Sequence, residues 1–497
     1  MKINLINPPL QVSKNYNEKI ELYQPTGLLY IAASLEKAGY EVYVLDALIE
    51  DYKNEKIIGE YKFIGLDFKE IAKRVSKSEI IGITGMSLWK DSIFYLISEI
   101  KKLNKKCKII VGGPYASWHP EECLKKGADF VVIGEGEITI LELIKSIEKK
   151  IDKKNILGIA YKYKNKIIIN KKRPFLQNLD EIPFPARHLI PMEKYFEAAK
   201  IYKYSRSQSK SNRTVSIITS RGCPFNCIFC SAFILSGKIW RFRSAENVVD
   251  EITECIKKYS VTDIYFEDEN MSLNKERMEK ICDMIIEKNL NITLHAPQGL
   301  RADTLDKNIL IKMKKAGFKS ITIAPETGSQ RVMDEIIDKK IKLTKIEEVV
   351  KNCKEIGIKV ACFFVIGMPG ETKEEIEQTL RYAHKLRKIG AYHCTVRNAM
   401  PIPGTRMYKI AKEKGYLLKD GIELENLMYS TKKHLMKTEY WSPFYIENIC
   451  KKAEMENIKD SNIKLINFFY AKKFIKGMIK APKETMKIVM KRIKFYI

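Results

Sequence analysis

Three cysteines lie within eight consecutive positions of this 497-residue chain, in the stretch TSRGCPFNCIFC at residues 219–230. They are Cys223, Cys227 and Cys230. A structural zinc site uses four ligands, and the nearest further cysteine, Cys255, lies within a helical pattern at no ligand spacing. A four-iron cluster held by three thiolates leaves one iron without a protein ligand, where a small molecule can bind. The spacing therefore favours an iron–sulfur cluster with an open iron over zinc.

A second set of chemically suited residues follows predicted strands in the first 150 positions. Apolar runs such as KINLIN, EVYVLDA and KIIVGG alternate with helical patterns, which predicts a doubly wound, Rossmann-like α/β domain. Four of these strands run into Asn7-Pro8-Pro9, Thr84-Gly85-Met86-Ser87, Gly112-Gly113-Pro114 and Gly134-Glu135-Gly136-Glu137. Glycine and proline also simply turn a chain, but four such loops at one sheet edge favour a ligand site. None is a G-x-G-x-x-G motif opening a helix after the first strand, which disfavours a nicotinamide cofactor.

The predicted organisation has four parts. Residues 1–150 form the α/β domain, and residues 151–213 form a proline-punctuated linker with one hairpin. Residues 214–415 contain six strand–helix units, which predicts a partial, TIM-like (β/α)6 barrel with its chemistry at the carboxyl face. The cysteines follow the first barrel strand and so lie at that face. Residues 416–497 form a mainly helical region that ends in a basic amphipathic tail.

The charge of the chain is strongly positive, with a formal net value of +27. Most of the excess is lysine spread along helical patterns, and no RNA-binding motif accompanies it, so we expect no nucleic-acid partner. The chain does not start with a signal-peptide pattern, and no apolar run reaches the roughly 18 residues of a membrane span. We therefore expect a cytoplasmic protein, whose free thiols stay reduced.

The motif C-x-x-x-C-x-x-C, with Phe229 before its last cysteine, resembles that of the radical S-adenosylmethionine superfamily. The resemblance implies that the three cysteines hold a 4Fe–4S cluster whose open iron chelates S-adenosylmethionine. Reduction of the cluster would cleave this cosubstrate to a 5′-deoxyadenosyl radical, with an electron from flavodoxin or ferredoxin.

The resemblance also implies a set of contacts to S-adenosylmethionine. These are Phe229 near the adenine, Asp268 and Glu269 in FEDEN at the methionine amine, Arg301 in GLRADTLD, Glu326 in APETGSQ at the ribose, and the backbone of Val365, Ile366 and Gly367 in FFVIGMPGET at the adenine. Asp268 and Glu269 equally fit a solvated acidic turn, and Arg301 equally fits a salt-bridged helix cap. Ala324-Pro325 and Thr327 depart from the Gly-Ile-Glu-Ser-Gly-Ser sequence of many relatives.

The domain ahead of the barrel resembles the cobalamin-binding domain of one class in this superfamily, and the resemblance to that class covers roughly residues 1–415. The implied cobalamin contacts are Pro8, Gly27, Leu28, Ser87, Gly112, Gly113 and Gly136, with the nucleotide tail running past Thr84 and Glu135. The D-x-H-x-x-G motif, whose histidine coordinates cobalt from below in other cobalamin proteins, is absent after the first strand. We interpret His119 as a surface residue, so cobalamin would bind without a histidine lower ligand.

Three functions follow from these cofactors. The first is C-methylation of an unactivated carbon through methylcobalamin, as in class B radical methyltransferases. The second is a non-methylating radical reaction, because the anaerobic magnesium-protoporphyrin IX monomethyl ester cyclase has the same layout. The third, a non-catalytic cobalamin or iron–sulfur sensor, is disfavoured by the intact radical motifs.

The tail from Ser461 combines an apolar stripe with flanking lysines. Such a stripe packs on the barrel or lies at an anionic membrane surface. Peripheral association with the inner membrane would favour a lipid over a small-molecule substrate.

Overall fold

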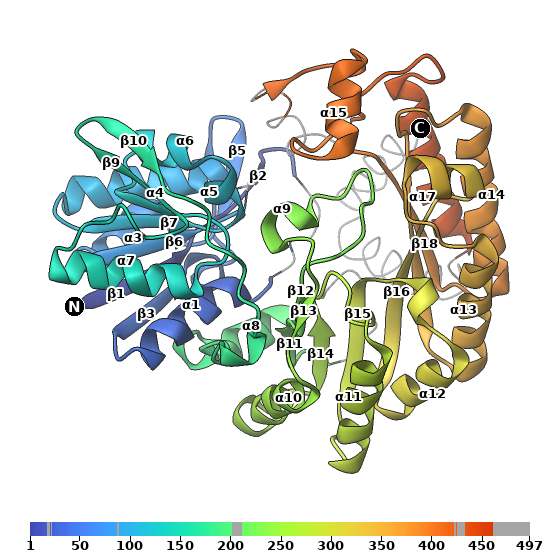
Figure 1. Ribbon diagram of the computed structural model, residues 1–497, viewed down its shortest axis with the longest axis horizontal. Helices are drawn as coiled ribbons and strands as arrows, with labels where there is room; N and C mark the ends of the chain where they lie inside the picture. Colours follow the sequence, from blue (N-terminus) through green and yellow to red (C-terminus); the bar gives the residue numbers. More distant parts are fainter. Residues whose placement is uncertain are drawn as a thin grey trace, which may run out of the picture.

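The computed structural model describes residues 1–16, 20, 22–86, 89–200, 211–421, 424 and 433–460. It places two α/β units side by side, the N-terminal unit in blue and teal and the second unit in green to orange (Figure 1). Helix α9 (Ala232–Ser236) lies between the two units. The cysteine-bearing segment that leads into this helix is therefore at their junction.

The N-terminal unit is built on a seven-stranded sheet in the order β10-β9-β8-β7-β6-β1-β3. The strands are β1 (Lys2–Asn7), β3 (Glu41–Asp46), β6 (Ile80–Thr84), β7 (Lys108–Gly112), β8 (Phe130–Val132), β9 (Ile159–Tyr163) and β10 (Lys166–Ile169). The first five are parallel, and the last two add an antiparallel hairpin at one edge. The five parallel strands confirm the predicted α/β domain.

Helices cover both faces of this sheet. They are α1 (Thr26–Lys37), α2 (Ala47–Glu50), α3 (Phe68–Arg74), α4 (Lys90–Leu103), α5 (Pro114–Trp118), α6 (Pro120–Lys125) and α7 (Glu137–Lys149). On one face Leu28 of α1 and Leu143 of α7 pack against the strands, and on the other Ile71 of α3 and Ile93 of α4 do so. Strands that are buried on both faces have continuous apolar sequences, so they could be predicted from the sequence.

The segment predicted as a linker belongs partly to the N-terminal sheet. Its hairpin consists of β9 and β10, joined by a turn at Lys164 and Asn165. Both residues have positive φ, as the central residues of a two-residue type I′ turn require. The remainder contains η2 (Leu179–Glu181), η3 (Arg187–Leu189) and α8 (Met192–Ala199). Buried Arg187 pairs with Glu251 of the barrel at 2.7 Å, so this segment is fixed to the second unit. A small sheet of β2 (Leu10–Ser13), β5 (Tyr61–Ile64) and β4 (Glu55–Ile58) was not predicted.

The second unit contains the six predicted parallel strands, in the order β11-β14-β15-β16-β17-β18. They are β11 (Thr214–Ile217), β14 (Asp263–Phe266), β15 (Thr293–Leu300), β16 (Phe318–Glu326), β17 (Lys359–Ile366) and β18 (His393–Asn398). Strands β11 and β18 form the two edges of the sheet, so the barrel is partial, as expected. A two-stranded ribbon, β12 (Ser220–Arg221) with β13 (Arg241–Phe242), brackets the cysteine loop.

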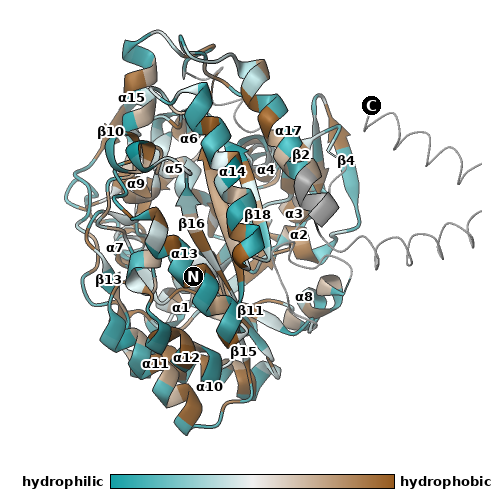
Figure 2. Cartoon of the chain, turned by 90° about the vertical axis from the view of Figure 1, so that its right-hand side faces the viewer, coloured by the Kyte–Doolittle hydropathy of each residue, from teal (hydrophilic) through white to brown (hydrophobic). Residues whose placement is uncertain are grey.

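Amphipathic helices cover the outside of the barrel sheet. They are α10 (Ala245–Tyr259), α11 (Lys275–Glu287), α12 (Lys307–Lys315), α13 (Leu343–Ile356) and α14 (Lys373–Ile389). Figure 2 shows their hydrophilic faces turned outward, and their apolar residues join the largest buried cluster of the molecule. Helix α14 begins at a capping box, in which Thr372 and Glu375 satisfy each other's backbone N–H groups.

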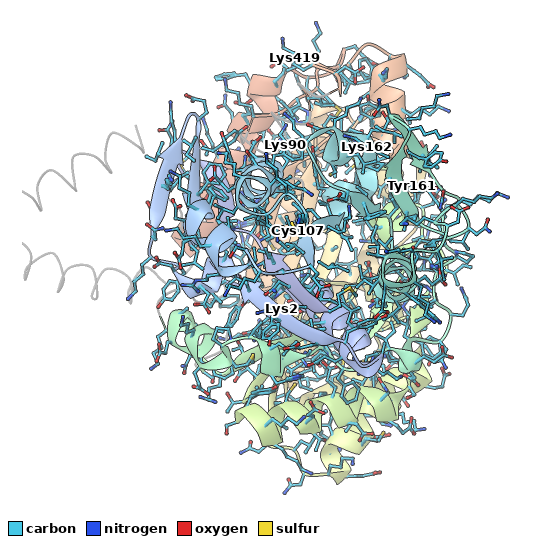
Figure 3. The ribbon with its side chains drawn as sticks, turned by 90° about the vertical axis from the view of Figure 1, so that its left-hand side faces the viewer. Lys2, Lys90, Cys107, Tyr161, Lys162 and Lys419 are labelled. Atoms are coloured by element: carbon cyan, nitrogen blue, oxygen red, sulfur yellow. The ribbon has the colours of Figure 1, made fainter. Side chains whose placement is uncertain are left out.

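The C-terminal region adds α15 (Arg406–Glu413) and α17 (Pro443–Asp460). The predicted amphipathic tail from Ser461 lies outside the described residues. Among the helices that are described, none is both long and apolar enough to cross a membrane. Figure 3 shows charged side chains spread over the outer face of the N-terminal unit, with Lys2 on the sheet and Lys162 on the hairpin.

Candidate cobalamin and radical site

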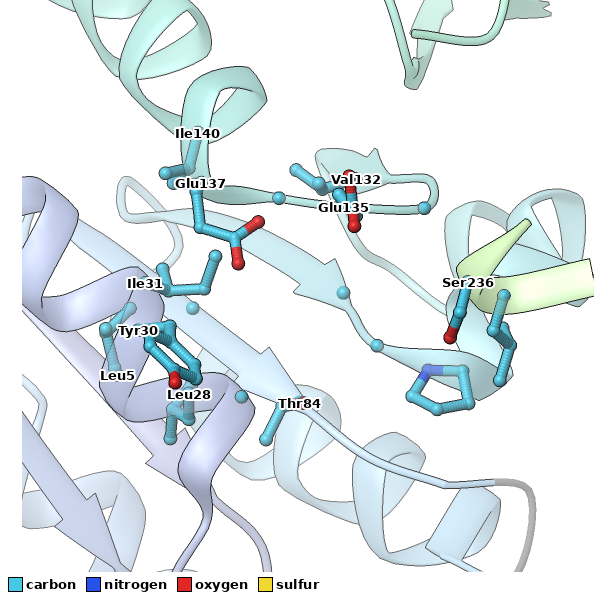
Figure 4. A pocket seen from close by; sticks show the side chains of 18 of the residues that line it. Leu5, Leu28, Tyr30, Ile31, Thr84, Val132, Glu135, Glu137, Ile140 and Ser236 are labelled. Atoms are coloured by element: carbon cyan, nitrogen blue, oxygen red, sulfur yellow. The ribbon is translucent and has the colours of Figure 1, made fainter. Parts of the chain in front are cut away.

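A pocket of about 390 Å³ lies at the carboxyl edge of the N-terminal sheet. Its lining includes Gly27, Leu28, Thr84, Gly112, Gly113, Glu135 and Gly136, all of which the sequence singled out. Figure 4 shows side chains from α1, from the end of β6 and from the loop after β8 around this space. Pro8 is buried outside this lining, and Ser87 lies outside the described residues.

Glycine is needed in this pocket for two different reasons. A Cβ on Gly112 would have Val132 as its nearest neighbour at 3.9 Å, so a larger side chain there would extend into the pocket. Gly113 has a φ of +90°, and a Cβ would lie 2.8 Å from Thr84 Oγ1. Backbone therefore forms much of the wall, which suits the close approach of a large flat ligand.

Residues of the second unit close the other side of the pocket. Ile218, Arg221, Leu235, Ser236, Glu267 and Glu269 contribute to its lining. Ser236 of α9 faces the sheet edge across the cavity in Figure 4. Both units therefore line the pocket. The sequence patterns of the separate units did not predict this.

Ion pairs fix the two units at this pocket. Arg221 pairs with Glu137 at 2.6 Å and with Glu135 at 3.2 Å, and Arg241 pairs with Glu135 at 2.8 Å. Burial alone would lower the pKa of Arg221, but the carboxylates of Glu137 and Glu135 raise it above its usual range. Glu135, predicted beside the cobalamin tail, therefore also joins the two units.

The cysteine loop runs from β12 to α9. Cys223, Cys227 and Cys230 are free thiols of intermediate exposure, and the backbone N–H of Cys230 donates to the carbonyl of Cys227 at 3.1 Å. Burial raises the pKa of all three thiols, that of Cys227 to about 11. Cys255, by contrast, is buried in the barrel core.

The donor set fits a cluster ligated by three thiolates. No three His, Cys, Asp or Glu side chains among the described residues already converge on a metal position, so the thiols would turn about their Cα–Cβ bonds to share one centre. Lys339 and Arg301 lie close enough for their charges to lower the thiol pKa values, opposing the effect of burial. These cations would favour the thiolate forms that an iron–sulfur cluster requires.

The two acidic candidates after β14 differ in their surroundings. Asp268 is buried and accepts from the backbone N–H of Thr219 at 3.0 Å and from the hydroxyls of Thr219 and Ser220 at 2.8 and 2.6 Å. Its burial raises its pKa, which these hydrogen bonds oppose. Glu269 accepts from Ser236 and lines the pocket. Asp268 thus secures the strand end before the cysteine loop, whereas Glu269 faces the shared cavity.

Three further predicted positions lie around the cysteine loop. The guanidinium of Arg301 lies 3.5 Å from the centre of the Phe225 ring and pairs with Asp303 at 2.7 Å, so it is both a salt-bridged cap and a contact of the loop. Glu326 has a φ of +66° and pairs at 2.7 Å with Lys339, which the sequence did not single out. Phe229 is half-buried against the barrel core.

The turn after β17 is held by a buried acid. Glu371 accepts from the N–H groups of Gly367 and Met368 at 2.7 and 3.1 Å, and burial raises its pKa to about 8. The ring of His434 lies under the turn, 2.9 Å from a Cβ placed on Gly367. Neither ring nitrogen of His434 has a hydrogen-bond partner among the described residues, and burial lowers its pKa to about 3. The turn after β17 contacts residues that are far apart in sequence, so no local sequence pattern predicted these contacts.

A second cavity, of about 620 Å³, lies on the inner face of the barrel sheet. Alternate residues of three adjacent strands line it: Ser320, Thr322 and Ala324 of β16, Ala361, Phe363 and Val365 of β17, and His393, Thr395 and Arg397 of β18. Glu326 lies at its rim, and Ile366 is buried on the opposite face of β17. The β18 residues were missed by sequence reasoning, although their two-residue spacing was visible in HCTVRN.

Comparison with known proteins defines the class. The model of the radical SAM superfamily matches residues 217–383, and that of the B12 binding domain matches residues 21–144. The chain belongs to the radical S-adenosylmethionine superfamily and carries a cobalamin-binding domain, so it is an enzyme of the cobalamin-dependent class. His119, which the sequence analysis interpreted as a surface residue, is partly buried, with its ring centre 4.9 Å from that of Tyr115, and it lies outside the pocket lining.

Individual relatives cover most of the chain. A methyltransferase of Pyrococcus horikoshii, described as uncharacterized, is 32% identical over 457 residues, 91% of each chain. The cytidylyl-2-hydroxyethylphosphonate methyltransferase of Streptomyces wedmorensis is 29% identical over 84% of this chain and 82% of its own. The anaerobic magnesium-protoporphyrin IX monomethyl ester cyclase of Rubrivivax gelatinosus is 25% identical over 73% of this chain and 62% of its own.

The fold agrees with a solved structure. The cobalamin-dependent S-adenosylmethionine radical enzyme OxsB, with aqua-cobalamin and S-adenosylmethionine bound, superposes with a TM-score of 0.70 at 17% identity, over all of this chain and 75% of that one. The predicted fold is therefore confirmed.

Proposed function

We propose that the protein is a C-methyltransferase that uses a 4Fe–4S cluster, S-adenosylmethionine and cobalamin. The observation that carries the proposal is the shared pocket, in which Glu269 and Ser236 beside the cysteine loop face the glycine-lined edge of the N-terminal sheet. Two cofactors held on opposite sides of one cavity can act on one substrate without releasing an intermediate.

Each cofactor has residues suited to it. Cys223, Cys227 and Cys230 would hold the cluster. Glu269, Glu326, Phe229, Arg301 and the turn at Val365 to Gly367 would hold S-adenosylmethionine, and the glycine-lined pocket would hold cobalamin. Bound together, these cofactors would supply a radical that removes hydrogen from an unactivated carbon and the methyl group that replaces it.

The chain itself supplies orientation and exclusion of water. Asp268 fixes the start of the cysteine loop, Lys339 fixes Glu326, and Glu371 fixes the turn after β17. Arg221 and Arg241 hold the two units in register. A reducing partner such as flavodoxin or ferredoxin would deliver the electron.

Methylation is favoured over cyclisation by the relatives, because the two with the higher identity are named methyltransferases. The cyclase-type reaction is the second candidate, supported by a relative of that name. The location remains the expected cytoplasm, and membrane association through the tail remains a prediction.

Anaerobic turnover with methyl-deuterated S-adenosylmethionine tests the proposal. We expect the acceptor to gain one labelled methyl group while 5′-deoxyadenosine accumulates. An acceptor that gains no label and changes mass by ring closure would establish the cyclase-type reaction instead. The cell extract of a strain lacking the gene provides the acceptor pool.

A further inference from the structure

The second cavity, on the inner face of the barrel, is lined by three basic side chains, Arg397, His393 and Lys359, and by one acid, Glu326. Arg397 of β18 points into it and makes no hydrogen bond or ion pair within the part of the chain that the structure describes. The acid in the lining, Glu326, is already paired with Lys339 at 2.7 Å. The guanidinium of Arg397 is exposed to the solvent of the cavity, and its planar set of N–H donors matches the oxygens of a phosphate or carboxylate.

The position of Arg397 follows from strand register. Arg397 is opposite Val365 across the β17–β18 ladder, at the carboxyl end of both strands. His393 is opposite Ala361, four residues nearer the amino end, which is about 13 Å along the strand. The cation therefore lies at the end of the barrel where the cysteine loop is found, and the cavity continues away from it.

The other groups of the cavity do not neutralise Arg397. His393 has a pKa below its usual value, because burial and the charges of Arg387 and Arg397 disfavour a further proton. Lys359 at the far end of β17 adds positive charge, with its ammonium 5.1 Å from the centre of the Tyr392 ring. Hydroxyl groups of Thr395, Thr322 and Ser320 can bond neutral polar atoms.

We propose that the methyl acceptor carries an anionic oxyacid group, a phosphate, phosphonate or carboxylate, which Arg397 binds at the carboxyl end of β18. The proposal rests on the proposed function in that it names the substrate class of the same enzyme. The anion would hold the acceptor by one end beside Val365, with the rest of the molecule along the walls formed by Phe363 and Ala361.

Binding of inorganic pyrophosphate to the full-length reconstituted protein tests the site without turnover. Titration calorimetry should detect binding to the wild type and to Arg381→Met, a matched change on the exposed face of α14. Arg397→Met should weaken binding about tenfold or more. Arg397→Lys should recover part of the loss, because lysine keeps the positive charge but cannot form two parallel hydrogen bonds to the anion. Absence of binding to the wild type, or equal binding by Arg397→Met, would overturn the proposal.

Kinetics then separate this proposal from the proposed function. With the acceptor purified from cell extract, Arg397→Met should raise KM for the acceptor about tenfold or more, with iron content and KM for S-adenosylmethionine unchanged. A higher KM for S-adenosylmethionine alone would assign Arg397 to the cosubstrate carboxylate and overturn the proposal. If no acceptor is methylated while Arg397→Met still loses pyrophosphate, the proposed function fails and the anion site stands.

The source of the anion is read from the labelled product. Recovery in the organic phase after chloroform–methanol extraction would identify a lipid headgroup, and retention on an anion exchanger from the aqueous phase would identify a soluble anion. A labelled product that is uncharged at neutral pH would contradict the proposal.

Discussion

The two cavities lie at comparable places, each against a parallel sheet, but they are built differently. Glycines and backbone form much of the wall at the N-terminal sheet edge, and three of its charged residues, Arg221, Glu135 and Glu137, are paired across the two units. Alternating side chains form the wall inside the barrel, and Arg397 remains unpaired there among the described residues. A backbone-lined pocket suits a large cofactor common to a whole class, whereas a side-chain-lined cavity can change with the substrate.

The largest expected effect separates the cysteine loop from the N-terminal pocket. Cys227→Ala removes one of three cluster ligands, so bound iron and cleavage of S-adenosylmethionine should be lost. Cobalamin binding should persist, because the N-terminal pocket does not include the thiol. Iron analysis and the cobalamin absorption spectrum measure both, with Cys450→Ala as the control. Full iron in Cys227→Ala would refute the cluster assignment.

The reciprocal change acts on the N-terminal pocket alone. Gly112→Phe should abolish cobalamin binding, since its ring would enter the cavity, while iron content stays normal. Gly112→Ala is the matched control, because its Cβ would have no neighbour nearer than 3.9 Å. Equal cobalamin binding by the two variants would show that the ligand lies elsewhere.

A smaller effect is expected at the junction of the two units, beside the N-terminal pocket. Arg221→Met leaves Glu137 and Glu135 without one partner in a largely buried position, and such a loss costs about 3–5 kcal/mol. Lys385→Met removes an exposed pair with Glu347, which contributes at most about 1 kcal/mol. Thermal unfolding should show a lower Tm for Arg221→Met than for Lys385→Met. Equal values would mean that the units are not held together by this pair.

The smallest effect is a pH dependence at the turn after β17. Burial raises the pKa of Glu371 to about 8, so the folded protein keeps this proton while the unfolded chain loses it. The stabilisation is full below the ordinary glutamate pKa and is lost as pH rises from there through about 8. Glu371→Gln keeps an acceptor for Gly367 and should flatten the fall of Tm between about pH 5 and pH 8. An unchanged slope would place the titration at another group.

How much the sequence predicted depends on how local each feature is. The cysteine spacing is a chemical pattern within eight residues. The glycine-rich strand ends can also be located from the sequence, because each follows a clearly apolar run that predicts a strand. Both could be recognised without any tertiary information. The partial barrel followed from six strand–helix alternations of the same kind.

The missed features are pairings between distant residues. Lys339 pairs with Glu326 because the chain after β16 turns back toward the end of that strand. His434 packs against Gly367, although the two residues are far apart in sequence. The hydrogen bonds of Asp268 to Thr219 and Ser220 depend on the packing of β14 beside β11, and its contact with the cosubstrate stays a prediction. The hairpin at Lys164-Asn165 was recognised, whereas its pairing with β8 was not.

Electron paramagnetic resonance of the holoenzyme tests most directly whether the cysteine loop and the N-terminal pocket form one catalytic site. Dipolar coupling between two unpaired electrons falls with the cube of their separation. We therefore expect the cob(II)alamin signal to broaden when the cluster is reduced, and to stay narrow in Cys227→Ala loaded with cobalamin. A cob(II)alamin signal that is the same with the cluster oxidised, reduced or absent would mean that the two cofactors lie far apart, and would contradict the account.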